Sequence, residues 1–364
     1  MQQQVVVVGA GHLGRIHARL LSQVEGARLA AIVDPNPNTL RAAAEQFSVP
    51  AFESLERCKL GFDAAIIASP TPCHYRTAME LLAKRKHLLV EKPLAVTGAH
   101  AQEMVVAARQ AGVVLQVGHV ERFNPAWIAA ADLTAKPKYI EAVRASRFPG
   151  RCLDVGVVMD LMIHDLDLVL SLTSAPLREV QASGLAVITD DEDLAEARLV
   201  FECGLVASLK ASRISPAASR QMQVYSEHGY AAIDFNGPAV TMIRPRAELL
   251  ERSFYLEEAT ANPLQFADVL FDEWLPVQVP EIPKRNAILD ELHDFVISIR
   301  SGTQPTVGGE AGSRAVEIAE AILAAIDTRC WTRESALAQR GPLAMPPEDI
   351  TAASRRQHQQ RPAA

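Results

Sequence analysis

The sequence has few cysteines, no long apolar run and no excess of basic residues. The cysteines are odd in number and lack the spacing of metal ligands; the five are Cys58, Cys73, Cys152, Cys203 and Cys330. We expect reduced thiols in a cytoplasmic protein and predict no metal site. No stretch approaches the apolar length of a membrane span, and the first residues already form a strand pattern. Neither a membrane segment nor a signal peptide is therefore expected.

The charge balance argues against one class of partner. With 36 basic and 43 acidic side chains the net charge is −7, which gives no global attraction for nucleic acid phosphates. A locally basic pocket for an anionic ligand remains compatible with this charge. The 364 residues, of which 49% are hydrophobic, are enough for two hydrophobic cores, so we expect two domains.

Strands and amphipathic helices alternate in the first third of the chain. Apolar runs lie at 4–9, 29–33, 64–68, 88–90 and 113–117, and helical patterns at 12–21, 73–83 and 99–111. This alternation predicts βαβ crossovers and a parallel sheet with helices on both faces. We therefore predict an α/β fold whose residues 1–120 form a doubly wound Rossmann domain.

After about residue 120 the pattern changes to short strands with tight turns. Hairpins are predicted around Glu202-Cys203-Gly204 and His228-Gly229, which indicates a mostly antiparallel sheet. Helical patterns at 125–132, 288–299 and 314–326 complete an α+β domain over residues 121–335. Residues 341–364, rich in Pro, Ala, Gln and Arg, are predicted to be a disordered tail. The acidic run 190–193 is interpreted as a solvated turn.

The segment from Gly9 to Gly14 fits the dinucleotide-binding pattern G-x-G-x-x-G. It follows a predicted strand and opens a helix, the context that makes this short pattern specific. Gly9 permits the tight turn, Gly11 lets the backbone approach a pyrophosphate, and Gly14 lets the helix pack on the strand. The helix N-terminus offers free N–H groups to the anion. His12 and Leu13 complete the candidate turn.

Asp34 ends the second strand, 20 residues after Gly14, where a carboxylate can accept hydrogen bonds from an adenosine ribose. A carboxylate there repels a 2′-phosphate, and residues 35–38 are Pro-Asn-Pro-Asn rather than a basic pair. NAD is therefore predicted rather than NADP. The alternative is a glycine turn in a Rossmann-like fold that binds no dinucleotide.

Two further segments follow strands of the same sheet, and ligands of such sheets lie beyond the strand ends. The candidate cofactor-binding residues there are Ser69, Pro70, Thr71, His74, Glu91 and Lys92. Lys92 lies between Glu91 and Pro93, where chemistry is expected, and an exposed surface lysine is the alternative. For Pro70 the alternative is a role in shaping the loop.

Three ionisable residues, Asp160, His164 and Asp167, lie at i, i+4 and i+7 of a largely apolar helical pattern. They therefore share one face of the helix. Burying three such groups is costly without partners or a polar cavity, which points to a substrate site. Acids paired with arginines for structure are the alternative, above all for Asp167.

Together these motifs resemble the Gfo/Idh/MocA family of oxidoreductases. The resemblance covers residues 3 to about 330 and rests on the glycine turn, Asp34, Ser69-Pro70-Thr71, Glu91-Lys92-Pro93 and the stretch 160–167. It implies that Lys92 lies near the nicotinamide, that Lys92 and His164 form the acid/base pair, and that Asp160 positions the substrate hydroxyls. Met162 stands where the family pattern Asp-x-Gly-x-His-x-x-Asp has glycine, which implies different packing around the substrate.

The reaction implied by this resemblance transfers a hydride from a secondary carbinol carbon to the nicotinamide and removes the hydroxyl proton. Either Lys92 or His164 can accept that proton first, and the sequence leaves the order open.

The run from Gly118 to Pro125, with the stretch 160–165, is similar to the subgroup that oxidises the 3-hydroxyl of UDP-N-acetylglucosamine. In that subgroup an aminotransferase converts the 3-keto nucleotide sugar to the 3-amino sugar of lipid A or surface glycans. A UDP-sugar needs cations for its diphosphate, and the candidates are Arg122, Arg144, Arg147, Arg151 and Arg213. Arg122, with Asn124 beside it, is the preferred substrate contact. Surface or structural roles are the alternative for the others.

Three other functions stay open. One is a dehydrogenase of a free sugar or inositol, including an enzyme that keeps NAD bound and shuttles hydride between two sugars. Another is a non-catalytic NAD-binding regulatory protein, against which the presence of both Lys92 and His164 argues. The third is a scaffold for an aminotransferase or acyltransferase. The resemblance also implies a homodimer or homotetramer that forms through the antiparallel sheet.

Overall fold

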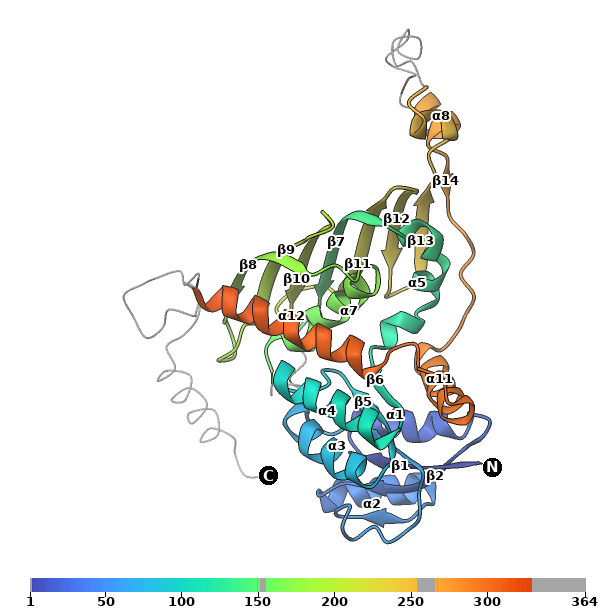
Figure 1. The fold of residues 1–364 in the computed structure, drawn as a ribbon, viewed down its shortest axis with the longest axis vertical. Coiled ribbons are helices and arrows are strands. Elements are labelled where there is room, and N and C mark those ends of the chain that lie inside the picture. The colour runs from blue at the N-terminus through green and yellow to red at the C-terminus, as the bar shows by residue number, and fades with distance from the viewer. Residues whose placement is uncertain (1, 149, 151–154, 254–265, 267, 329–364) are drawn as a thin grey trace, which may run out of the picture.

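The computed structural model describes residues 2–148, 150, 155–253, 266 and 268–328. Two sheets organise this part of the chain, one from each of the two predicted segments (Figure 1). None of the described helices is long and apolar enough to span a membrane. The predicted tail, residues 341–364, lies outside the described residues and stays a prediction.

The first sheet is entirely parallel and confirms the predicted Rossmann fold. Its strands are β1 (Gln3–Val8), β2 (Ala27–Val33), β3 (Ala51–Phe52), β4 (Ala64–Ile67), β5 (His87–Glu91) and β6 (Leu115–Gly118). They lie in the order β3-β2-β1-β4-β5-β6. The connecting helices are α1 (His12–Leu21), α2 (Pro37–Phe47), η1 (Thr71–Cys73), α3 (His74–Ala83) and α4 (Gly98–Ala111).

The second sheet is mostly antiparallel, as predicted. Its strands are β7 (Pro137–Ala145), β8 (Leu177–Leu185), β9 (Leu194–Phe201), β10 (Val206–Ser212), β11 (Ser219–Ser226), β12 (Gly229–Asp234), β13 (Ala239–Ile243) and β14 (Val277–Gln278). The order is β14-β13-β12-β11-β7-β10-β9-β8, and among these described strands only the β7–β10 pair is parallel. Both predicted hairpins, β9–β10 and β11–β12, are confirmed.

Helices cover one face of this second sheet (Figure 1). The helices in contact with the sheet are α5 (Pro125–Ala129), α6 (Ala131–Thr134), η3 (Val158–Met162), α7 (Ile163–Ser171) and α12 (Gly309–Thr328). The other helices of this segment are η2 (Val120–Phe123), α8 (Ala247–Leu250), η4 (Leu270–Trp274) and α11 (Ala287–Ser301), and α11 packs on α1 of the first domain. Gly302 is the left-handed C-cap that ends α11. The predicted helical stretch at 160–167 is helical, but it begins as the π-helical turn η3 before α7.

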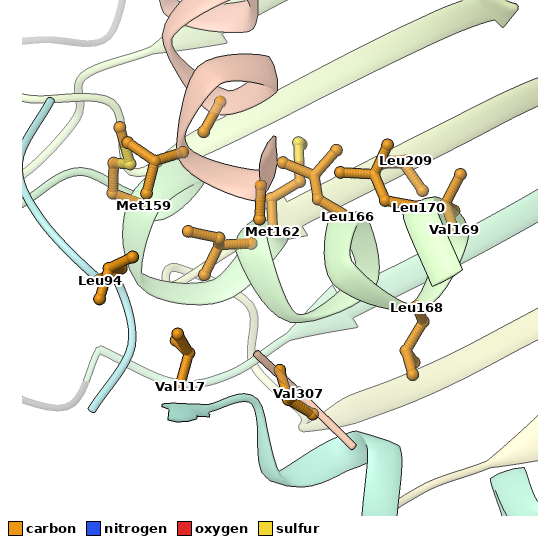
Figure 2. Packing of buried hydrophobic residues seen from close by; sticks show 14 of the residues in the cluster. Leu94, Val117, Met159, Met162, Leu166, Leu168, Val169, Leu170, Leu209 and Val307 are labelled. Atoms are coloured by element: carbon orange, nitrogen blue, oxygen red, sulfur yellow. The ribbon is translucent and has the colours of Figure 1, made fainter. Parts of the chain in front are cut away.

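The largest hydrophobic cluster joins the two sheets. Leu94 and Val117 of the first domain belong to the same buried cluster as Met162 and Leu166 of η3 and α7 (Figure 2). Close packing of this kind resists displacement. The helices that carry Asp160 and His164 are therefore held firmly against the carboxyl ends of the Rossmann strands.

The acidic run 190–193 is a solvated turn in its first half only, since Asp190 and Asp191 are exposed. Asp193 is fully buried, and its Oδ1 accepts a hydrogen bond of 2.7 Å from Arg213 Nε. Its Oδ2 accepts the backbone N–H groups of three residues, Val187, Ile188 and Thr189. Glu192 Oε1 in turn accepts the backbone N–H of Val158 at 3.0 Å. The interpretation was wrong for Asp193 because its compensating cation, Arg213, directly follows β10 and lies 20 residues further along the chain.

Candidate functional site

A cavity of about 1260 Å³ lies where the carboxyl ends of the Rossmann strands face the second domain. The loops after β1, β2, β4 and β5 line one side of it, and β7, β11, η3 and α7 line the other. This is the crevice in which doubly wound folds bind their ligands. Most of the residues predicted for the cofactor and substrate sites line it.

The glycine turn has the shape that a dinucleotide requires. Gly9 has φ +98°, and a Cβ there would lie 2.6 Å from Ala68 O. A Cβ on Gly14 would lie 1.8 Å from Gly9 O, whereas one on Gly11 would meet nothing within 4 Å. Close backbone packing therefore requires glycine at positions 9 and 14, and Gly11 leaves the backbone open to the cavity. His12 and Leu13 also line the cavity, while Gly14 is buried behind them.

The N-terminus of α1 is free to bind an anion. Its N-cap, Gly11, makes no side-chain capping bond, so the first backbone N–H groups of the helix are not occupied by a cap. Asp34 lies beside this turn and lines the cavity. Its Oδ2 accepts the backbone N–H of Ala10 at 2.6 Å and its Oδ1 that of Asn36 at 2.8 Å. These bonds hold the carboxylate at the position expected for a ribose contact.

The loop after β4 adds a free polar group. Ser69, Pro70 and Thr71 line the cavity, and Ser69 Oγ is buried without a hydrogen-bond partner among the described residues. An orphaned hydroxyl of this kind is available to a ligand. His74 lies behind this loop and does not line the cavity; its ring nitrogens contact Pro93 O at 2.9 Å and Ser69 O at 2.8 Å. The structure therefore places His74 between two cofactor loops rather than at the cavity surface.

Glu91 lies on the cavity wall and is tied to α1. Its Oε1 lies 2.6 Å from His17 Nε2, in a pair whose histidine is fully buried. Burial acts to raise the pKa of Glu91, but the hydrogen bond and charge of His17, with the charge of Lys92, lower it overall. Glu91 Oε2 also accepts the backbone N–H of Lys92 at 3.3 Å. The ionised carboxylate thus fixes the segment that presents Lys92.

Lys92, Asp160 and His164 come together in the cavity. Lys92 Nζ donates to Asp160 Oδ1 at 2.8 Å and to Asp160 O at 2.7 Å. The two side chains are 14% and 13% exposed, so the pair is shielded from solvent and still reachable by a ligand. Lys92 follows β5 of the first domain and Asp160 lies on η3 of the second. The alternative of an isolated surface lysine does not hold.

The surroundings of His164 favour the neutral form of its imidazole. Burial, followed by the positive charges of Lys92 and Arg144, holds the pKa of His164 well below its ordinary value. A neutral imidazole next to an ammonium group is able to accept a proton from a substrate hydroxyl at neutral pH.

Asp167 is separated from the other two residues of its predicted face. It does not line the cavity; its Oδ2 lies 3.8 Å from Arg122 Nη1. The π-helical turn η3 changes the angular spacing, so Asp160 and Asp167 do not stay in register. The structural reading of Asp167, an acid next to an arginine, is the one observed.

The structure does not bring Arg122 and Asn124 into the cavity. Arg122 is directed to Asp167 and to Thr306 O. Asn124 Oδ1 caps α5 by accepting the N–H of Ala126 at 3.1 Å. The shaped loop that suggested a substrate contact is thus a helix start held by its own side chains.

Three of the other candidate arginines are now placed, and Arg151 lies outside the described residues. Arg144 reaches the cavity wall but donates to Asp165 and Glu121 inside the protein. Arg213 is buried against Asp193. Arg147 is exposed and lines the cavity, as does Arg220, which sequence reasoning missed. Arg220 is paired with Arg144 across β11 and β7, a register that the sequence alone did not supply.

Comparison with known proteins agrees with this geometry. Residues 3–119 match the model described as "Oxidoreductase family, NAD-binding Rossmann fold", and residues 137–232 match the GFO/IDH/MocA C-terminal domain. The UDP-N-acetylglucosamine 3-dehydrogenase of Acidithiobacillus ferrooxidans is 32% identical over 323 residues, covering 88% of this chain and 96% of that protein. The scyllo-inositol 2-dehydrogenase (NAD(+)) of Bacillus subtilis is 30% identical over 59% of this chain and 69% of its own length.

A crystal structure of the Acidithiobacillus enzyme superposes with a TM-score of 0.78 at 30% identity, covering 90% of this chain and 98% of that one. Fold, cofactor turn and sequence similarity all agree over most of the chain. The protein therefore belongs to the Gfo/Idh/MocA family of NAD-dependent oxidoreductases.

Proposed function

We propose that this protein oxidises the 3-hydroxyl of UDP-N-acetylglucosamine to the 3-keto nucleotide sugar with NAD. The observation that carries the proposal is the meeting of Lys92, Asp160 and His164 in the cavity that the glycine turn also lines. The choice of sugar is supported by the 32% identity to a UDP-N-acetylglucosamine 3-dehydrogenase.

The residues around the glycine turn fit NAD. The free N–H groups of α1 and the clearance at Gly11 suit its diphosphate, and Asp34 suits the hydroxyls of its adenosine ribose. Ser69 Oγ offers one further hydrogen bond. Bound at these residues, NAD would supply the acceptor for the hydride of the carbinol carbon.

The proton of the same carbinol is handled by Lys92 and His164. The neutral ring of His164 accepts a proton directly, and the ammonium of Lys92, held by Asp160, donates a hydrogen bond to the reacting oxygen. Asp160 keeps a carboxylate oxygen beside the sugar hydroxyls. The oxidation is then balanced, because one hydride leaves the carbon and one proton leaves the oxygen.

Arg147 and Arg220 replace Arg122 as the proposed diphosphate contacts. Both are exposed on the cavity wall opposite the glycine turn, and guanidinium groups bind phosphate oxygens in bidentate geometry. Coupling to an aminotransferase that consumes the ketone, and a homodimer or homotetramer formed through the second sheet, belong to the same proposal. The open face of that sheet carries neighbouring tyrosines, Tyr139, Tyr225 and Tyr230.

The first test follows NADH formation by absorbance in purified protein incubated with NAD and a panel of substrates. UDP-N-acetylglucosamine should be oxidised, whereas other UDP-sugars, free N-acetylglucosamine, glucose and inositols should not. A carbonyl trap or a partner aminotransferase is included so that an unfavourable equilibrium does not hide turnover. Lys92→Ala should lower kcat by about 100-fold or more, the contribution of a positioned acid/base group.

A further variant and the substrate panel distinguish the proposed function from its alternatives. Arg220→Gln should raise the KM of the nucleotide sugar by about 10-fold, as expected for one lost charge-assisted contact, and leave NAD affinity unchanged.

Turnover of free sugars or inositols would support membership of the family and contradict the nucleotide-sugar substrate. Bound NAD without any turnover would point instead to a regulatory protein.

A further inference from the structure

A group of buried polar atoms lies behind His164. Among the described residues, His164 Nδ1, both ring nitrogens of His119 and Asp167 Oδ2 are buried without a hydrogen-bond partner. His119, which joins β6 to η2, is only 1% exposed. Its ring meets that of His164 edge to face, with 6.4 Å between the centroids and an interplanar angle of 87°. Buried polar atoms without partners are rare in folded proteins, so this group calls for a physical account.

The buried nitrogen of His164, Nδ1, determines whether the other ring nitrogen can accept a proton. Because the ring lines the cavity and Nδ1 is buried, Nε2 is the nitrogen left to face a substrate. A neutral imidazole carries one N–H and one lone pair, and the contact made by one nitrogen decides which of them carries the hydrogen. His164 can accept a proton at Nε2 only if its hydrogen is on Nδ1. A hydrogen-bond acceptor beside Nδ1 favours the tautomer that carries its hydrogen on Nδ1.

We propose that His119 is a positioning residue that holds His164 in the tautomer with its hydrogen on Nδ1, through one buried water molecule. The 6.4 Å between ring centroids is too long for a direct hydrogen bond between the rings. It suits two hydrogen bonds of about 2.9 Å each that meet at a water. The proposal rests on the acid/base role proposed for His164.

The surroundings of His119 favour a neutral ring, which can accept a hydrogen bond from the water. Burial lowers the pKa of His119. The charges of Lys92 and Arg122 lower it further, whereas those of Asp167 and Glu91 act to raise it. In the proposed arrangement, a neutral His119 gives its lone pair to the water and its N–H to the side of Asp167, whose negative charge acts on the ring. Asp167, close to Arg122 Nη1, thereby gains a function that its position outside the cavity did not suggest.

The proposed arrangement leaves the chemistry balanced. The substrate hydroxyl proton passes to Nε2 of His164 as the hydride leaves the carbon, and the ring becomes an imidazolium. Its Nδ1–H stays hydrogen-bonded to the water, which His119 holds throughout. The positive charge therefore forms with its inner hydrogen bond already in place.

The kinetic test compares two substitutions of His119. His119→Phe keeps an aromatic ring but removes both nitrogens, and it should lower kcat by about 10- to 100-fold, the range for groups that orient a catalytic ligand. The KM of the sugar and the affinity for NAD should change less than about twofold, which also shows that the fold is intact. His119→Gln keeps an acceptor and should recover most of the lost kcat. An unchanged kcat in His119→Phe overturns the proposal.

The tautomer itself is measured by ¹⁵N NMR of histidine-labelled protein, with the His164 signals identified by their loss in His164→Gln. Wild-type His164 should show a protonated Nδ1 and an unprotonated Nε2, and His119→Phe should shift the ring toward the opposite tautomer. A protonated Nε2 in the wild type, or the same tautomer in His119→Phe, contradicts the inference. Because this measurement needs no turnover, its failure is distinct from failure of the proposed reaction.

Discussion

Glu291, on α11, is a buried acid with no compensating partner. It is 0% exposed, and neither carboxyl oxygen has a hydrogen-bond partner among the described residues. Burial, followed by the negative charges of Glu91 and Asp294, raises the pKa of Glu291 well above its ordinary value. The folded protein therefore favours the protonated carboxyl over a wider pH range than the unfolded chain does.

Glu291→Gln should make the protein more stable at neutral and alkaline pH. As pH rises above the unfolded value of 4.5, the unfolded chain loses this proton and the folded wild type keeps it. Wild-type stability consequently falls, by about 1.4 kcal/mol for each pH unit up to the folded pKa. The glutamine variant lacks this loss. Urea unfolding at a series of pH values should show a stability gap that is near zero around pH 4 to 5 and widens upward.

The exposed acid Glu45 of α2 is the matched control for that measurement. Glu45→Gln should follow the wild type within about 0.5 kcal/mol at every pH. A gap between Glu291→Gln and the wild type that does not vary with pH would mean that Glu291 is ionised in the folded protein.

For single residues, a location in the cavity could be predicted where the residue belongs to a sequence motif. Lys92, Asp160 and His164 were named from their spacing and resemblance, and all three line the cavity. Prediction failed where the placement depends on tertiary contacts. Arg122 was chosen for its neighbours in the chain, yet its partner Asp167 lies in α7. Arg220 enters the cavity only through the pairing of β11 with β7, which no local pattern specifies.

Among the elements, the turn 186–193 shows how a surface-like sequence can be structural. Asp193 is buried between the backbone of the turn and Arg213, and Arg213 Nη1 also donates to Val155 O at 2.9 Å. Glu192 caps the start of η3 through the N–H of Val158. The turn thus supports the element that carries Asp160. Its role could not be read from composition, because four consecutive acids are typical of a solvated loop.

Asp193→Asn should destabilise the protein by about 3 kcal/mol or more, because it leaves the buried guanidinium of Arg213 without its counter-charge. Asp191→Asn, in the same turn but exposed, should change stability by no more than about 0.5 kcal/mol. Urea unfolding followed by circular dichroism measures both. Equal small effects would show that the Asp193–Arg213 pair contributes little.

The elements themselves were predictable to different degrees. The Rossmann strands and both hairpins follow from apolar runs and turn residues, since these signals are local. The π-helical turn η3 was not predictable, because its apolar residues keep the spacing of an ordinary helix. Yet this turn separates Asp160 from Asp167 and so decides which acid reaches the cavity.

For the whole molecule, α11 from the second segment of the chain completes the Rossmann core. Leu292, Phe295 and Val296 of α11 belong to one buried cluster with Val5 of β1 and Ile32 of β2. Glu291, one residue before, reaches the cofactor cavity. Residues 1–120, the predicted first domain, consequently share their core with a helix from the second segment. The two predicted domains should therefore unfold together rather than independently.

Phe295→Ala tests this coupling. The fully buried ring should cost about 3 to 5 kcal/mol of stability when removed, and the loss should appear equally in NAD binding and in the unfolding of the second sheet. Ile297→Ala, on the same helix but with a side chain 58% exposed, should cost no more than about 0.5 kcal/mol.

Urea unfolding followed by NAD binding and by far-UV circular dichroism gives the two readouts. A single shared transition in Phe295→Ala supports one cooperative unit, because α11 belongs to the second segment of the chain and packs in the core of the first domain. Two separated transitions would instead assign α11 to the Rossmann domain alone and leave the second sheet independently stable.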